Sequence, residues 1–183
     1  MQLSTYLKEN KPLYTRKGSF TTAYIYPDRV LLKSRDAVKE CMANGWFPDS
    51  EHLPEVKYSN LEVPDSFEGS IYESPRYLTS RSIKSIVCKE DYEGIYLPLV
   101  KLFSESPWCW LKHGERQDAF YKAVTDTTIP EELKDVLKEC YDALLNYDSQ
   151  VGFEISPRNV GATEEGRLIL LDCFYLVAHL KRK

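Results

Sequence analysis

The sequence contains no apolar run long enough to cross a bilayer. A membrane-spanning helix needs about 20 consecutive, mostly apolar residues, and no stretch of this 183-residue chain approaches that length. The opening stretch, MQLSTYLKENKP, lacks the apolar core of a secretory signal peptide. We therefore expect a cytoplasmic protein that has no membrane partner.

Basic residues are not in excess either. The 24 lysines and arginines are outnumbered by 28 aspartates and glutamates, which gives a formal net charge of −4. A nucleic-acid-binding surface needs clustered Lys and Arg to neutralise phosphates. We see no such basic stripe, so we expect no nucleic-acid partner.

Paired cysteines are also missing. No two of the five cysteines form a CxxC pair, which argues against a zinc site or a thioredoxin-type motif. The three histidines have no spacing that would join one of them to a nucleophile. We expect free thiols in a reducing compartment. The cysteines are Cys41, Cys88, Cys109, Cys140 and Cys173.

The first half of the chain, to about residue 75, has the pattern of β-strands. A length of 183 residues predicts one domain or one domain with two lobes, and the hydrophobic fraction of 43% is enough for a core. Residues 20–34 (FTTAYIYPDRVLLKS) predict two strands around the turn YPDR. Residues 36–45 predict a short helix that ends at a glycine. Two further short strands are expected at residues 54–63 and 69–75.

The second half, from about residue 76 to 183, has the pattern of helices. Residues 80–89 and 91–103 predict two helices, and residues 128–147 predict the most regular one. Thr128 with a glutamate three positions later favours a capping box at its start. The tryptophan-rich stretch WCW at residues 108–110 is expected to pack in the interior.

Three polar residues flank a hairpin that we predict from RNVGA, TEEG and RLILLD. Glu154 and Asn159 precede it, and Asp172 follows its second strand. The open ends of paired strands lie together, so Asn159 and Asp172 are expected to be close, with oxygen atoms that suit Mg²⁺ or Mn²⁺. A carboxylate such as Glu154 can accept a proton from a hydroxyl group. The structural alternatives are a loop cap for Asn159, a turn for Asp172 and a loop-amide acceptor for Glu154.

This spacing resembles the catalytic loop and metal-binding motif of protein kinases. The kinase loop reads Asp-x-x-x-x-Asn; here Glu154 stands at the first position and Asn159 follows five residues later. Asp172 follows Asn159 by thirteen residues, and LLDCF resembles the strand that leads into Asp-Phe-Gly. The resemblance implies that Glu154 is the catalytic base and that Asn159 and Asp172 hold the metal.

Earlier motifs occur in the kinase order. The stretch RKGSFTTAY resembles the loop that covers the phosphates of ATP, with Gly18, Ser19 and Phe20 at its centre. The stretch VLLK resembles Val-Ala-Ile-Lys, which implies that Lys33 pairs with the nucleotide phosphates.

The resemblance extends to the residues that would support the nucleotide. Glu40 is the candidate ion-pair partner of the phosphate-binding lysine, with Asp36 as its rival. Residues 71–77 (IYESPRY) resemble the kinase hinge, so backbone groups between Glu73 and Tyr77 would meet the adenine ring.

The likeness is greatest to the compact host-shutoff Ser/Thr protein kinases that short-tailed bacteriophages make early in infection. It implies an α+β, bilobal, minimal protein-kinase-like fold, with an antiparallel β N-lobe to about residue 75 and a truncated helical C-lobe from about residue 76. It also implies ATP- and Mg²⁺-dependent phosphotransfer to a host bacterial protein in the host cytoplasm.

Departures from the kinase pattern leave the activity open. Glu154 replaces the catalytic aspartate, Gly152 and Phe153 replace the preceding His-Arg, and no Ala-Pro-Glu follows DCF. The chain is then an active minimal protein kinase or a pseudokinase that inhibits a host protein by occupancy. A small-molecule kinase is a third reading, which the missing substrate-side helices disfavour.

Overall fold

The computed structural model describes residues 1–103, 113–148 and 150–177. The chain divides into two compact units, Met1–Trp46 with Glu55–Arg76, and Phe47–Pro54 with Tyr77–Lys183. Helices and antiparallel strand pairs occur in both units, which confirms the α+β class. In the described residues no helix is both long enough and apolar enough to span a membrane. The expected packing of residues 108–110 lies outside the described residues.

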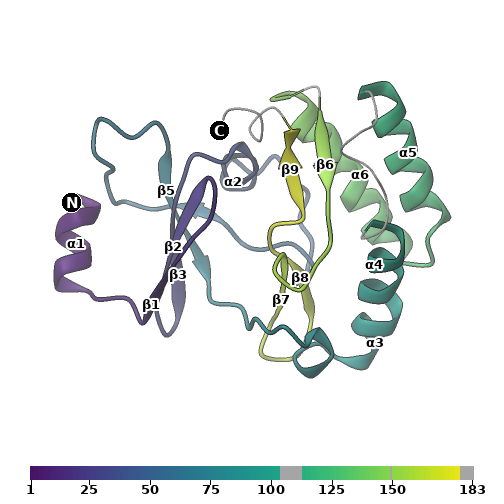
Figure 1. The fold of residues 1–183 in the computed structure, drawn as a ribbon, viewed down its shortest axis with the longest axis horizontal. Coiled ribbons are helices and arrows are strands. Elements are labelled where there is room, and N and C mark those ends of the chain that lie inside the picture. Colours follow the sequence, from purple (N-terminus) through teal and green to yellow (C-terminus); the bar gives the residue numbers. More distant parts are fainter. Residues whose placement is uncertain (104–112, 149, 178–183) are drawn as a thin grey trace. The chain divides into compact units, whose positions relative to one another are not determined.

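The first unit is built on a five-stranded antiparallel sheet (Figure 1). The turn that joins β2 to β3 is closed by a hydrogen bond from the amide of Tyr26 to the carbonyl of Arg29, 2.8 Å long, as the YPDR pattern predicted. Of the strand predicted over residues 54–63, only Lys57–Tyr58 forms a strand. In spatial order the strands are β1 (Tyr14–Lys17), β2 (Thr21–Ile25), β3 (Arg29–Ser34), β5 (Ser70–Pro75) and β4 (Lys57–Tyr58).

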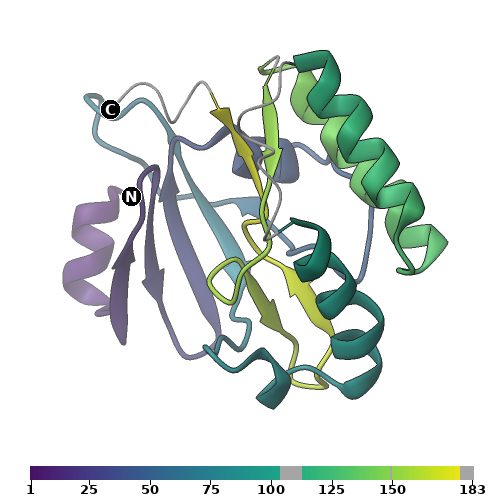
Figure 2. The ribbon, with the colours of Figure 1, turned by 45° about the vertical axis from the view of Figure 1, so that its right-hand side comes forward.

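Two helices, α1 (Leu3–Glu9) and α2 (Ala37–Ala43), lie on opposite sides of this sheet (Figures 1 and 2). Asp36 caps α2 by accepting a 3.0 Å hydrogen bond from the Val38 amide, and Gly45 ends it with φ +70°. The predicted helix over residues 36–45 is therefore confirmed. No prediction covered α1, whose seven residues bury only one side chain.

The second unit carries most of the helices, and α5 and α6 run side by side in it (Figures 1 and 2). The helix predicted over residues 80–89 is wrong, because only a 3₁₀ turn forms there. The prediction over residues 91–103 is confirmed as one helical run with a π-helical stretch, and α5 was not predicted. The elements are the 3₁₀ turn Ile83–Ser85, α3 (Lys89–Asp91), the π-helical Tyr92–Tyr96, α4 (Leu97–Phe103), α5 (His113–Asp126) and α6 (Glu131–Leu145).

Helix α6 begins later than its sequence pattern indicated. Its N-cap is Pro130, whose carbonyl accepts the amide of Leu133 at 3.0 Å, so the predicted capping box at Thr128 is wrong. The reason is steric, since the residue before a proline is driven out of the helical region and the helix cannot include Ile129. The buried residues of the helix are Leu133, Lys134, Leu137, Cys140, Tyr141 and Leu144.

Two short strand pairs complete the second unit: β6 (Val151–Phe153) with β9 (Phe174–Leu176), and β7 (Val160–Ala162) with β8 (Leu168–Leu170). The β7–β8 hairpin confirms the prediction from the sequence, and Gly166 supplies the positive φ of +87° that its turn requires. The first pair was not predicted. Its strands are three residues long and far apart in the chain, so neither shows an alternating pattern.

Aromatic rings hold the β6–β9 pair against the helices. The ring of Phe153 lies 4.9 Å from that of Phe174 and 4.8 Å from that of Phe103, centroid to centroid. Phe120 of α5 stacks on Tyr141 of α6 at 4.6 Å. All five rings are buried, so the strand pair that ends beside Glu154 is anchored in the core of the second unit.

We predict that Gly161→Ala destabilises the second unit. A Cβ on Gly161 would lie 2.7 Å from the carbonyl oxygen of Leu78, and such overpacking costs about 1–3 kcal/mol. Gly94→Ala is the control, because a Cβ there meets nothing within 4 Å. Urea unfolding checks both variants, and equal stability of the two would contradict the close approach of β7 to Leu78.

Candidate functional site

The structure brings Asn159 and Asp172 together through their backbones. The amide of Asp172 donates a 3.0 Å hydrogen bond to the carbonyl of Asn159, just after β8 ends and just before β7 begins. The amide of Asn159 in turn donates to the Ser156 carbonyl at 3.0 Å, which closes a turn before β7. The expected proximity of these two side-chain positions is confirmed.

Glu154 joins the same place from the neighbouring strand pair. It is exposed and directly follows β6, and its amide donates a 2.8 Å hydrogen bond to the carbonyl of Cys173. The thiol of Cys173 lies 3.5 Å from the carbonyl oxygen of Asn159. Backbone hydrogen bonds at residues 172–173 therefore bring Glu154, Asn159 and Asp172 to one place. Glu154 and Asp172 are exposed to solvent. We call these three residues the acid–amide cluster.

The acid–amide cluster has the donor set of a magnesium site that phosphates complete. Mg²⁺ is commonly held by one or two carboxylates together with substrate phosphates and water. Asp172 offers a carboxylate and Asn159 a carboxamide oxygen, from two positions whose backbones are hydrogen-bonded. Among the described residues, no group of three or more His, Cys, Asp and Glu side chains could hold a metal. That finding does not cover the pair of Asp172 and Asn159, because asparagine is not one of these four residue types.

The predicted phosphate-covering loop is the turn between β1 and β2. The amide of Gly18 donates to the carbonyl of Thr21 at 2.8 Å, and Ser19 and Phe20 form the tip. A Cβ on Gly18 would lie 3.3 Å from the same carbonyl oxygen, so a side chain there would press on the turn.

Lys33 lies on β3, near the middle of the first unit's sheet. It stands opposite Thr22 of β2 and Ile71 of β5. Its ammonium nitrogen lies 4.3 Å from the centre of the Phe67 ring. In the part of the chain that the structure describes, neither Lys33 nor Glu40 of α2 takes part in an ion pair. The Lys33–Glu40 pair stays a prediction.

The remaining predicted residues lie along and after β5. Asp36, the rival partner of Lys33, is the N-cap of α2. Glu73 is on β5, and its carboxylate lies 3.7 Å from Nε of Arg29. Tyr77 is the first residue after β5 that belongs to the second unit, one position before Leu78 bridges to Ala162. The structure thus gathers the acid–amide cluster in the second unit, and it places the nucleotide-binding candidates in the first unit except for Tyr77.

A buried charge network that the sequence did not reveal supports the cluster. Asp91 of α3 is 1% exposed, and its carboxylate accepts hydrogen bonds from Nη1 of Arg167 at 2.9 Å and from the amide of Leu168 at 2.8 Å. The Asp91 carboxylate raises the pKa of the Arg167 guanidinium. These bonds fix the start of β8, the strand that leads to Asp172. No sequence signal marks a pair whose members are 76 positions apart.

His52 ties a distant segment to the same strand. Its Nδ1 lies 2.9 Å from the carbonyl oxygen of Leu168, so this nitrogen carries the proton that it donates. Its own carbonyl accepts the Leu170 amide at 2.8 Å. His52 is buried and its Nδ1 is 4.0 Å from the Asp91 carboxylate. His52 therefore works as a structural anchor for β8, a role that its isolated place in the sequence did not indicate.

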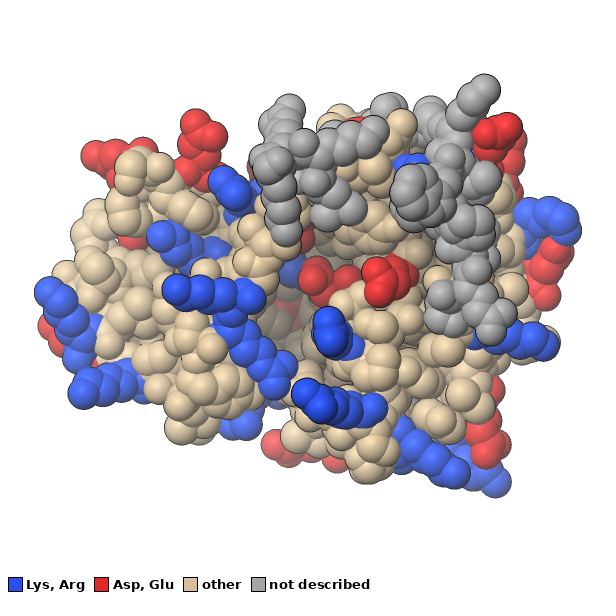
Figure 3. Space-filling model, in the orientation of Figure 1, with Lys and Arg blue, Asp and Glu red and all other residues tan. Residues whose placement is uncertain are grey.

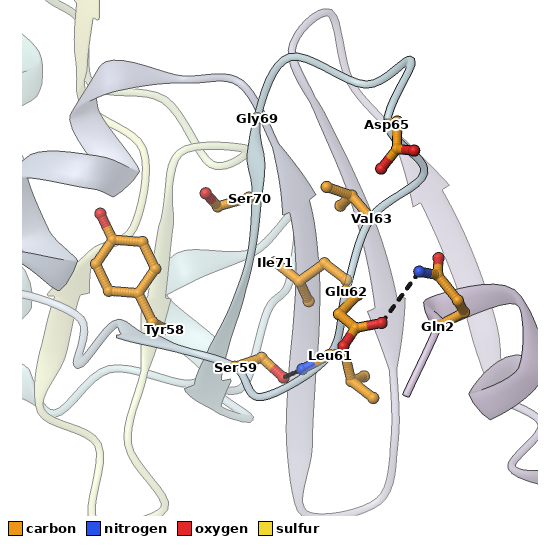
Figure 4. A pocket seen from close by; sticks show the side chains of 10 residues that line it. All are labelled: Gln2, Tyr58, Ser59, Leu61, Glu62, Val63, Asp65, Gly69, Ser70 and Ile71. Carbon is orange, nitrogen blue, oxygen red and sulfur yellow. Dashed lines mark hydrogen bonds between the residues drawn. The ribbon is translucent and has the colours of Figure 1, made fainter.

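A cavity of about 410 Å³ lies elsewhere in the first unit (Figure 4). Its wall includes Ser70, Ile71 and Glu62, and none of the predicted site residues lines it. The Glu62 carboxylate accepts a hydrogen bond from the Gln2 amide at 3.1 Å and lies 3.7 Å from the ammonium of Met1. The charge of Glu62 is thus matched within the chain, and Asp65 is a second acid in the cavity wall.

Among the described residues, both basic and acidic side chains occur on the face that Figure 3 draws. Comparison with protein-family models, with curated proteins and with solved structures finds no match for this chain.

We predict that Asp91→Ala loosens the support of the acid–amide cluster. It leaves the Leu168 amide and the half-exposed Arg167 guanidinium without their buried acceptor, which costs about 2–4 kcal/mol of unfolding free energy. Glu93→Ala is the control, because the exposed Lys89–Glu93 pair, 4.0 Å apart, is worth at most about 0.5 kcal/mol. Urea titration measures both, and a loss at Asp91 no larger than at Glu93 would refute the supporting role.

Proposed function

We propose that this chain is a minimal protein-kinase-like phosphotransferase that transfers the γ-phosphoryl group of ATP to Ser or Thr of a bacterial protein. The observation that carries the proposal is the acid–amide cluster. Its members follow the kinase spacing, and backbone hydrogen bonds of 2.8 Å and 3.0 Å hold their positions around residues 172–173. In this proposal the two compact units are the N-lobe and the truncated C-lobe of a kinase-like fold.

The first unit would supply contacts to the nucleotide. An antiparallel sheet with a glycine in its β1–β2 turn and a lysine on β3 is the arrangement that the phosphate-binding role needs. Gly18 lets the backbone of the turn approach phosphate oxygens, and the Lys33 ammonium neutralises the α- and β-phosphates. Backbone groups between Glu73 and Tyr77 would hydrogen-bond the adenine ring.

The second unit would supply the metal and the acceptor chemistry. Asn159 and Asp172 would hold Mg²⁺ or Mn²⁺, which neutralises charge on the phosphate chain when it is bound. Glu154 orients the acceptor hydroxyl and takes its proton while the hydroxyl oxygen bonds to the γ-phosphorus and the bond to the ADP oxygen breaks. Most of the rate gain comes from positioning and charge neutralisation.

Glu154 also carries the second candidate function. It is one methylene longer than the aspartate of kinases, and a displacement of about 1 Å at the reacting centre can cost roughly 100-fold in rate. A chain that keeps the nucleotide contacts but has lost this alignment is a pseudokinase, which would inhibit a bacterial protein by occupancy.

We expect ATP with Mg²⁺ to raise the melting temperature of the protein. A ligand at about 100 times its Kd that binds only the native state adds about 2.7 kcal/mol of stability.

Lys33→Ala should weaken ATP binding with or without metal, whereas Asp172→Ala should remove only the metal-dependent part of ATP binding. Lys57→Ala and Glu164→Ala are matched exposed controls. No thermal shift at millimolar ATP with either Mg²⁺ or Mn²⁺ would refute nucleotide binding.

We expect Glu154→Gln to lower phosphotransfer about 10²- to 10⁴-fold and to leave ATP binding unchanged, because it removes the proton acceptor and keeps the size. The assay is pure protein with γ-labelled ATP, Mg²⁺ or Mn²⁺ and a bacterial lysate, with Glu164→Gln as control.

Glu154→Asp then separates the two candidate functions. If the loop is adapted to glutamate, aspartate lowers the rate; if glutamate is a degraded aspartate, the exchange raises it. A wild-type protein that binds ATP but labels no lysate protein, and that Glu154→Asp does not rescue, is the pseudokinase.

A further inference from the structure

The Lys33 ammonium has an aromatic partner in the first unit. Its nitrogen lies 4.3 Å from the centre of the Phe67 ring, well inside the separation of about 6 Å at which a ring face attracts a cation. Lys33 and Phe67 are both half-buried. In the described residues Lys33 has no carboxylate within ion-pair distance, so the ring is the partner that restrains its charged end.

The loop before β5 holds the Phe67 ring in this position. The Phe67 amide donates to the Pro64 carbonyl at 2.8 Å, and the Gly69 amide donates to the Phe67 carbonyl at 3.0 Å. The amide of Ser59 donates to the Ile71 carbonyl at 2.9 Å, which closes the base of the loop. The ring thus belongs to a turn that is hydrogen-bonded on both sides.

Gly69 brings this turn against β3. A Cβ at Gly69 would lie 2.4 Å from the carbonyl oxygen of Ser34 and 2.6 Å from a ring carbon of Phe67. Ser34 directly follows Lys33 on β3. Only a residue without a side chain permits this approach, and the approach is what sets the ring beside the lysine.

We infer that Phe67 is the positioning residue of Lys33, holding its ammonium in one place before a phosphate arrives. A lysine side chain is a flexible four-carbon stem, and an ammonium already restrained loses less conformational freedom on binding. The ring face covers one side of the ammonium, which has three N–H donors to share with phosphate oxygens. The expected effect on ATP binding rests on the proposed function, whereas the restraint of the Lys33 ammonium by the Phe67 ring does not.

The hold is tested first without any nucleotide. In NMR spectra of the full chain, the Lys33 ε-methylene protons should be shifted upfield by the Phe67 ring current. Phe67→Leu should remove the shift, Phe67→Tyr should keep it, and Ser66→Ala in the same loop should leave it unchanged. Ordinary ε-methylene shifts in the wild type would overturn the inference.

Calorimetric titration with ATP and Mg²⁺ then tests the consequence. Phe67→Leu should raise the ATP Kd about two- to five-fold, the size expected for one partly exposed cation–π contact, and Phe67→Tyr should restore it. In a Lys33→Met background Phe67→Leu should have no further effect. A tighter Kd in Phe67→Leu, or the same change in both backgrounds, would overturn the positioning role. If the wild type shows the ring-current shift but binds no ATP, the contact of Phe67 with Lys33 is supported and the proposed function is refuted.

Discussion

The segment that links β8 to β9 is held on both sides by backbone hydrogen bonds, and the site depends on this constraint. Asp172 donates its amide to the carbonyl of Asn159, and Cys173 accepts the amide of Glu154. These two bonds are made by main-chain groups. Carboxylate and carboxamide groups, which Glu154, Asn159 and Asp172 carry, are the oxygen ligands and the proton acceptor that the proposed chemistry needs.

The surroundings of this segment explain why it keeps its shape. On one side the buried aromatic rings of α5, α6 and β9 fix β6, which leads into Glu154. On the other side Asp91 and His52 fix β8, which leads into Asp172. A buried carboxylate is retained only where its partners compensate for its lost hydration. The Asp91 network satisfies this condition with a guanidinium and a backbone amide, so the support is polar and specific on one side and apolar on the other.

Short sequence patterns predicted those parts of the fold that interactions between residues close in the chain determine. The YPDR turn, the helix that Gly45 ends and the β7–β8 hairpin each rest on residues a few positions apart, and each was predicted. The capping box at Thr128 failed because the constraint that Pro130 places on the preceding residue outweighs a side-chain cap. The β6–β9 pairing and the contact of Asp91 with Arg167 join distant residues, and no short pattern encodes them. Within the candidate site, sequence spacing alone predicted that Asn159 and Asp172 lie close together. The position of the Phe67 ring beside Lys33 depends on a loop whose conformation no short sequence pattern predicts.

The proposed function requires that the acid–amide cluster hold a divalent metal together with a nucleotide. The most direct measurement is paramagnetic broadening by Mn²⁺ in NMR spectra, recorded with and without a non-hydrolysable ATP analogue. We predict that broadening centres on the side-chain amide of Asn159 and the backbone amide of Asp172, and that it requires the analogue. Broadening confined to other acidic side chains, or unchanged when the analogue is omitted, would contradict the assignment of this cluster to phosphotransfer.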